Sequence, residues 1–144
     1  MMTQIKDRQE EIIEEFSMLD GNMEMILNYI IELGEELSGF PDHERVDKNI
    51  VKGCQSKVWL IASYANGRIQ YKADSNAAIT RGLVSLLVRV LNQSSPQDVV
   101  NAEVYFPKQI EMDRFIGTQR SNGFASMIKQ MKMYAVVFLA KQKS

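Results

Sequence analysis

Two runs of alternating apolar residues meet at Asn66-Gly67, and this junction limits the local structure of the chain tightly. The alternating apolar positions are Val58, Leu60, Ala62 and Tyr64 before the pair and Ile69, Tyr71 and Ala73 after it. Asn-Gly between such runs is the strongest short-range signal for a β-hairpin, because both central residues of a type I′ turn need a positive φ. The sequence therefore predicts an antiparallel hairpin over residues 57–73.

Helical spacing of apolar residues predicts helices before and after the hairpin along the chain. The predicted helices cover residues 5–16, 23–37 and about 76–92, with a short helix at Ser95-Pro96 and a last one from near Ser121. Residues Val46–Val51 are compatible with a third strand. This order predicts an α+β fold, with a small antiparallel sheet of about three strands packed by helices on one side. We expect Trp59 to pack under a helix and Gly82 to allow close packing against the sheet.

Composition places the chain among globular proteins, and its length fits one domain over residues 1–144. A formal net charge of −1 gives no overall basic field that would hold nucleic acid or an anionic membrane. The longest apolar runs are too short to span a bilayer, and the N-terminus is too charged for a signal peptide. We therefore expect a cytoplasmic protein that binds neither nucleic acid nor membrane, and nothing in the sequence requires more than a monomer.

The chain has one cysteine, Cys54, which excludes an intramolecular disulfide and any metal or iron–sulfur site built from several cysteines. Two interpretations of this thiol remain open. Gly53 permits a tight turn that presents the sulfur to another protein, and Lys52, Lys57 or an arginine brought near by folding would lower the thiol pKa. Alternatively, Cys54 is a small buried hydrophobe, which is the usual place of a free cysteine.

The only histidine, His43, would have to serve as the base of a cysteine hydrolase. It lies in the polar segment Pro41-Asp42-His43-Glu44, where nothing indicates a residue that would orient it. We therefore interpret His43 as a solvated loop residue, which makes a cysteine hydrolase an unfavoured function for this chain.

Around the cysteine, the segment Asn49-Ile50-Val51-Lys52-Gly53-Cys54-Gln55-Ser56-Lys57-Val58-Trp59 resembles the signature N-x-V-x-G-C-x-S-x-V-W of the SufE/CsdE family. Two further stretches are similar to that family. Asp74-Ser75-Asn76-Ala77-Ala78-Ile79 resembles the segment after the hairpin, although the family often has Asp at the position of Asn76. Arg120-Ser121-Asn122-Gly123-Phe124 resembles the motif that opens the last helix, with Gln119 in place of the usual Ser.

The resemblance implies a covalent sulfur carrier and desulfurase activator rather than a stand-alone enzyme. Cys54 would accept sulfane sulfur as a persulfide from a SufS/CsdA-like cysteine desulfurase. It would then pass the sulfur to an iron–sulfur scaffold complex or another acceptor, for iron–sulfur cluster assembly. The fold would be similar to the SufE/IscU-like fold. The chain itself would need no cofactor and no metal, because the pyridoxal phosphate belongs to the desulfurase.

The same resemblance suggests which residues surround the reaction. Arg120 is a candidate to lie near Cys54 and to stabilise a thiolate or persulfide anion, the alternative being a solvated residue at a helix N-terminus. The residues expected to contact the partner are Gly53, Gln55, Ser56, Asp74, Asn76 and Gly123. The competing hypothesis for the whole chain is a non-catalytic α+β interaction module in which Cys54 is only structural.

Overall fold

In the computed structural model, which describes residues 2–143, the predicted hairpin is present. Strand β1 (Val58–Ala65) pairs antiparallel with β2 (Arg68–Ser75), in a register that runs from Val58 opposite Ser75 to Ala65 opposite Arg68. Asn66 and Gly67 form the two-residue turn with φ values of 55° and 78°. These positive angles are the ones a type I′ turn requires, and this is why Asn-Gly identified the turn.

The sheet has two strands instead of about three. Within Val46–Val51 the chain forms the short 3₁₀ helix η2 (Asp47–Asn49), and only Ile50 makes a bridge, with Trp59. The side-chain amide of Asn49 donates a hydrogen bond to the carbonyl oxygen of Glu44 at 2.8 Å, which favours the turns of this segment over an extended strand. A second 3₁₀ helix, η1 (Asp42–Glu44), precedes it.

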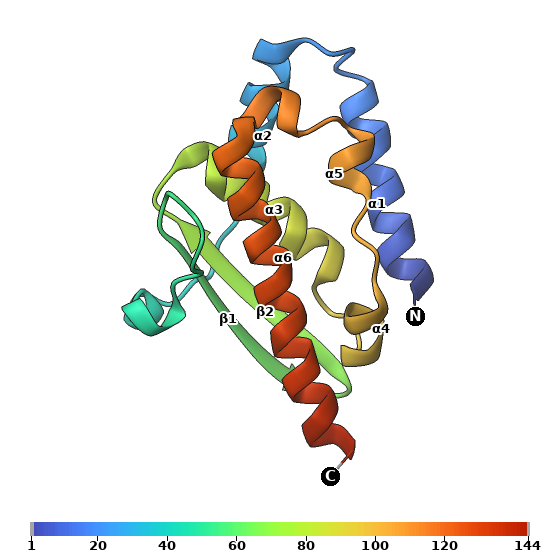
Figure 1. Cartoon of the computed structure of the whole chain (residues 1–144), viewed down its shortest axis with the longest axis vertical. Helices are drawn as coiled ribbons and strands as arrows, with labels where there is room; N and C mark the ends of the chain where they lie inside the picture. The colour runs from blue at the N-terminus through green and yellow to red at the C-terminus, as the bar shows by residue number, and fades with distance from the viewer. Residues whose placement is uncertain (1, 144) are drawn as a thin grey trace.

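Helices supply the rest of the fold and cover one face of the hairpin, as predicted (Figure 1). They are α1 (Met2–Ser17), α2 (Met23–Glu35), α3 (Ala78–Leu91), α4 (Pro96–Asn101), α5 (Phe106–Gln109) and α6 (Asp113–Lys143). The sequence did not predict α5. It placed the start of the last helix near Ser121, whereas α6 begins at Asp113 and is interrupted at Gly117, which has a φ of 82°.

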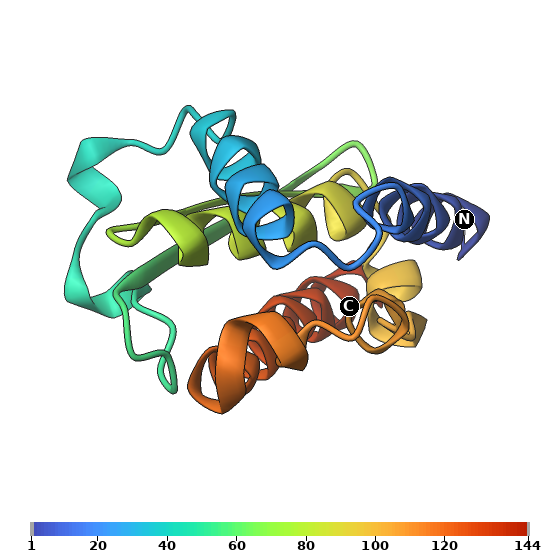
Figure 2. The ribbon, with the colours of Figure 1, turned by 90° about the horizontal axis from the view of Figure 1, so that it is seen from above.

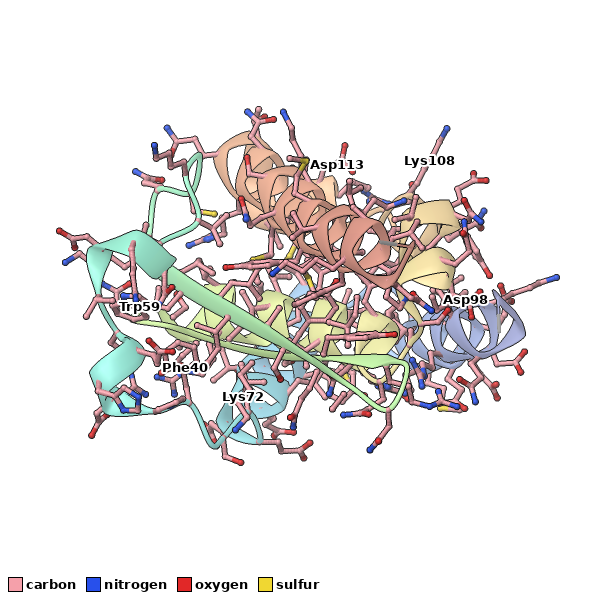
Figure 3. The ribbon with its side chains drawn as sticks, turned by 90° about the horizontal axis from the view of Figure 1, so that it is seen from below. Phe40, Trp59, Lys72, Asp98, Lys108 and Asp113 are labelled. Atoms are coloured by element: carbon pink, nitrogen blue, oxygen red, sulfur yellow. The ribbon has the colours of Figure 1, made fainter. Side chains whose placement is uncertain are left out.

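Alternation along the strands separates the two faces of the sheet. On the inner face, side chains such as Leu60, Ile69 and Tyr71 are buried in the core with α3 and α6, and the Tyr71 hydroxyl donates to the carbonyl oxygen of Met131 at 2.6 Å. The expectation for Trp59 is wrong. Because Val58 and Leu60 face the core, Trp59 is turned to the other face, where it is half-buried on the side away from α6 (Figure 3).

Helix α3 forms the central layer between α2 and α6 (Figure 2). Gly82 makes this layer possible, but against α2 rather than against the predicted sheet. A Cβ atom at Gly82 would lie 2.0 Å from the carbonyl oxygen of Ile30, and one at Gly34 would lie 2.7 Å from the backbone nitrogen of Gly82. The two helices therefore meet backbone to backbone. Among the described residues, no helix is long and apolar enough to cross a bilayer.

Candidate functional site

The segment between η2 and β1 carries the cysteine and is fixed at its base by the sheet. The Val51 amide donates to the carbonyl oxygen of Val58 at 2.8 Å. Gly53 then turns the chain with a φ of 97°, and a Cβ there would lie 2.4 Å from Ser126 Oγ on α6. Glycine is thus required for both its backbone angle and its lack of a side chain, although the bulk it removes faces Ser126 and not the sulfur.

Cys54 points inward from this turn. The residue is half-buried, packs against the hydrophobic core and lies next to α6. Its Sγ is 3.4 Å from the carbonyl oxygen of Gly123, to which the thiol donates a weak hydrogen bond. A Cβ at Gly123 would lie 3.4 Å from that sulfur, so glycine leaves room for the thiol against the helix.

The sulfur lines a pocket of about 80 Å³ between the Cys54 turn, α3 and α6. The polar residues that line it are Gln55, Ser56, Thr80, Gln119 and Arg120. The remaining lining residues beside Cys54 are Val58, Leu83, Val84, Gly123, Phe124 and Met127. A water molecule occupies about 30 Å³ in the liquid, so the space beside the thiol is larger than one small atom needs.

Burial raises the pKa of the Cys54 thiol above its ordinary value. The expected lowering of this pKa by Lys52, Lys57 or an arginine is not found, because desolvation is the cause that acts on the thiol in this conformation. Arg120 does line the same pocket as Cys54, as the sequence suggested. The residue is exposed, and its guanidinium donates to the carbonyl oxygen of Ile116 at 3.3 Å. A role for Arg120 with a sulfur anion stays a prediction.

Two of the predicted contact residues instead hold the neighbouring segments together. Asp74 is buried, and its carboxylate lies 2.6 Å from Arg45 Nη2 and 2.9 Å from Arg81 Nε. Asn76 is exposed, and its side-chain oxygen accepts a hydrogen bond from the Lys57 amide at 3.1 Å. Both therefore stabilise the region where the Cys54 turn enters β1, and their contact with a partner stays a prediction.

The other predicted residues are divided between surface and interior. Gly53 and Gln55 are exposed, Ser56 is half-buried in the pocket lining, and Gly123 is buried beneath the sulfur. His43 is exposed in η1 and is absent from the pocket lining. Among the described residues, no three His, Cys, Asp or Glu side chains lie close enough together to bind a metal ion.

Sequence reasoning missed several residues that build this site. Ser126 supports Gly53, and Thr80 and Met127 form part of the pocket wall. Arg45 stacks on Phe40, with its guanidinium carbon 5.3 Å from the ring centroid, while it pairs with Asp74. These residues lie on segments far from Cys54 in the chain, and no local pattern connects them to it.

Two comparisons with known proteins bear on this arrangement. A family model described as "SufE: Fe-S metabolism associated domain" matches residues 10–135. Among solved structures, the solution structure of a hypothetical protein from Thermus thermophilus superposes with a TM-score of 0.76. The superposition covers 92% of this chain and 96% of the Thermus thermophilus chain. At 17% sequence identity, this likeness shows a shared fold.

Proposed function

Because the chain belongs to the SufE family, whose domain is associated with Fe–S metabolism, we propose that Cys54 carries sulfur between two proteins of that metabolism. It receives sulfane sulfur from a cysteine desulfurase and delivers it to an iron–sulfur scaffold complex or a similar acceptor. The observation that supports this most is the single thiol on a glycine turn, with a pocket of about 80 Å³ beside its sulfur.

The proposed chemistry needs only the thiol. The Cys54 thiolate attacks the terminal sulfur of a persulfide on the desulfurase, so that one S–S bond forms as another breaks. The terminal sulfur keeps its proton, and the desulfurase cysteine leaves as a thiolate. No oxidant or reductant is consumed. A second cysteine nearby would discharge the product as a disulfide, so a lone thiol suits a carrier.

The inward thiol implies two conformations of the turn. In the inward form the raised pKa of Cys54 lowers the thiolate fraction, which makes the resting sulfur a weak nucleophile. Desulfurase binding would swing the turn outward for transfer. The loaded persulfide would then return to the pocket, where Leu83 and Phe124 exclude water and Arg120 offers a positive charge.

One observation favours the alternative of an interaction module with a structural cysteine. A half-buried thiol with a raised pKa is also what a core-filling cysteine shows. Alkylation separates the two ideas. A carrier should be alkylated slowly alone and faster with the desulfurase, whereas a structural thiol stays equally inert in both cases.

Desulfurase turnover tests the proposal itself. The parent protein should stimulate alanine release from cysteine by the desulfurase, because Cys54 removes the enzyme-bound persulfide at each cycle. Cys54→Ser should not stimulate it. If Cys54→Ser stimulates turnover as well as the parent does, Cys54 is not the carrier.

A further inference from the structure

A second hollow of about 490 Å³ lies on the other side of the Cys54 turn, between the loop before β1 and helix α6. We call it the lysine groove. Lys48 and Lys52 lie on its loop wall, and Lys129 lies on its helix wall. Its apolar lining includes Leu60, Met133 and Tyr134. None of the described residues that line it is acidic, although Glu44 is near enough to help raise the pKa of Tyr134.

The groove continues along α6 as an exposed apolar surface. Met133, Val136 and Val137 are each about half exposed, at 52%, 47% and 47%. Residues three and four apart are neighbours on a helix, so the three side chains form one patch. Exposed apolar side chains gathered in this way mark sites of protein interaction.

These features select the chemistry of an occupant. Lysines on both walls attract carboxylates, and the apolar lining and patch would bury apolar side chains between them. Nucleic acid fits less well, because Tyr134 is the one aromatic residue among the described lining residues, whereas proteins that bind single strands stack successive bases on several aromatic side chains. The complementary ligand is an acidic, amphipathic protein segment.

The state of the Cys54 turn indicates which protein brings this segment. The groove is formed while the thiol points inward, so a protein can bind in it before the turn moves. A sulfur donor is the partner that needs this movement first, because it must reach the thiol to transfer its sulfur. Val51 and Lys52 line the groove, and so does Ser126, against which Gly53 packs. An occupant therefore touches the base of the turn that must move to expose the sulfur.

We propose that the lysine groove docks an acidic, amphipathic segment of the cysteine desulfurase and couples its binding to release of the Cys54 turn. This inference rests on the proposed function. It adds a docking surface on the opposite side of the turn from the thiol pocket.

The test compares two double charge reversals with equal net charge. Lys48→Glu with Lys129→Glu changes one lysine on each wall and leaves the Cys54 turn untouched. Lys72→Glu with Lys108→Glu is the matched control, since these two side chains lie away from the groove on β2 and α5 (Figure 3). The probes are the purified desulfurase and the iron–sulfur scaffold complex from the same genome, with thermal unfolding as the check on folding.

The groove variant should bind the desulfurase at least about tenfold more weakly than the parent, and the control should stay within about twofold. The parent's affinity should also fall with added salt. Equal desulfurase binding by both double variants would overturn the proposal. The proposal would also be overturned if the groove variant bound the desulfurase normally but no longer bound the scaffold complex. The same holds if the groove variant bound the desulfurase normally but no longer bound a 20-nucleotide RNA that the parent binds. If the parent binds the desulfurase but never gains sulfur on Cys54, the proposed function fails while the docking surface stands.

Discussion

Replacing Gly53 by alanine should release the Cys54 turn without unfolding the protein. An L-residue held at a positive φ costs about 1–2 kcal/mol, and the φ here is 97°. The new methyl would also lie 2.4 Å from Ser126 Oγ and 3.1 Å from Ser126 Cβ. Rotating the hydroxyl away relieves the first contact but not the second, which adds roughly 1–3 kcal/mol of overpacking.

The turn can escape both costs by opening, because Lys52 and Gly53 are already exposed. If the alanine destabilises the closed form of the Cys54 turn by at least about 1.4 kcal/mol, the fraction of molecules with an open turn rises tenfold or more. Alkylation of Cys54 by iodoacetamide should therefore be about tenfold faster or more in Gly53→Ala than in the parent. The midpoint of thermal unfolding should fall by several degrees, because the same penalty destabilises the closed native form, but the protein should stay folded at 25 °C.

Two further variants separate the causes. Gly67→Ala imposes a positive φ of 78° with no atom within 4 Å, so it should lower stability and leave Cys54 alkylation unchanged. Gly53→Ala with Ser126→Gly removes both the hydroxyl and the Cβ of residue 126 from the contact and should recover part of the parent's slow rate. If alkylation of Gly53→Ala stays within twofold of the parent, the contact with Ser126 does not hold the thiol inward.

Three other perturbations follow from the structure. Gly82→Ala should lower the free energy of unfolding, measured in urea, by about 3 kcal/mol, because the new Cβ meets the Ile30 backbone, which cannot move aside as a flexible side chain would. A loss of less than about 1 kcal/mol would contradict the close contact between α2 and α3. Because burial raises the pKa of the Cys54 thiol in the folded state, the unfolded chain loses this proton at a lower pH, and the free energy of unfolding should decline as pH rises above about 8.5. A Cys54→Ser variant whose stability declines equally would show that the thiol is not the cause. Arg120→Ala should keep the fold and slow persulfide formation roughly tenfold, while an unchanged rate would exclude Arg120 from the mechanism.

The parts of the fold that depend on neighbouring residues could be predicted from the sequence. Asn66-Gly67 determined the hairpin because the turn needs two positive φ angles, and Ser95 caps α4 by accepting from the Asp98 amide at 3.1 Å. The third strand expected at Val46–Val51 is wrong. Its apolar residues suit a strand, but the backbone turns of η2 and the Asn49 hydrogen bond prevail over them.

The direction of the thiol could not be predicted, because the atoms that decide it are distant in sequence. Cys54 Sγ meets the carbonyl oxygen of a glycine 69 residues later, and Gly53 meets a serine on the same helix. The ion pairs of Asp74 have the same origin, since Arg45 and Arg81 approach it from two separate segments. Motif similarity pointed to Cys54, Arg120 and Gly123, which line one pocket, but it did not predict which of them face solvent.

The central claim is that Cys54 accepts one sulfur atom from a cysteine desulfurase, and intact-protein mass spectrometry tests it most directly. The parent should be incubated with the desulfurase and cysteine, with Cys54→Ser treated in parallel. We predict that the parent gains the mass of one sulfur atom, that a reducing agent removes it, and that the modified peptide contains Cys54. A parent that gains no sulfur, or a Cys54→Ser variant that gains as much, would contradict the account.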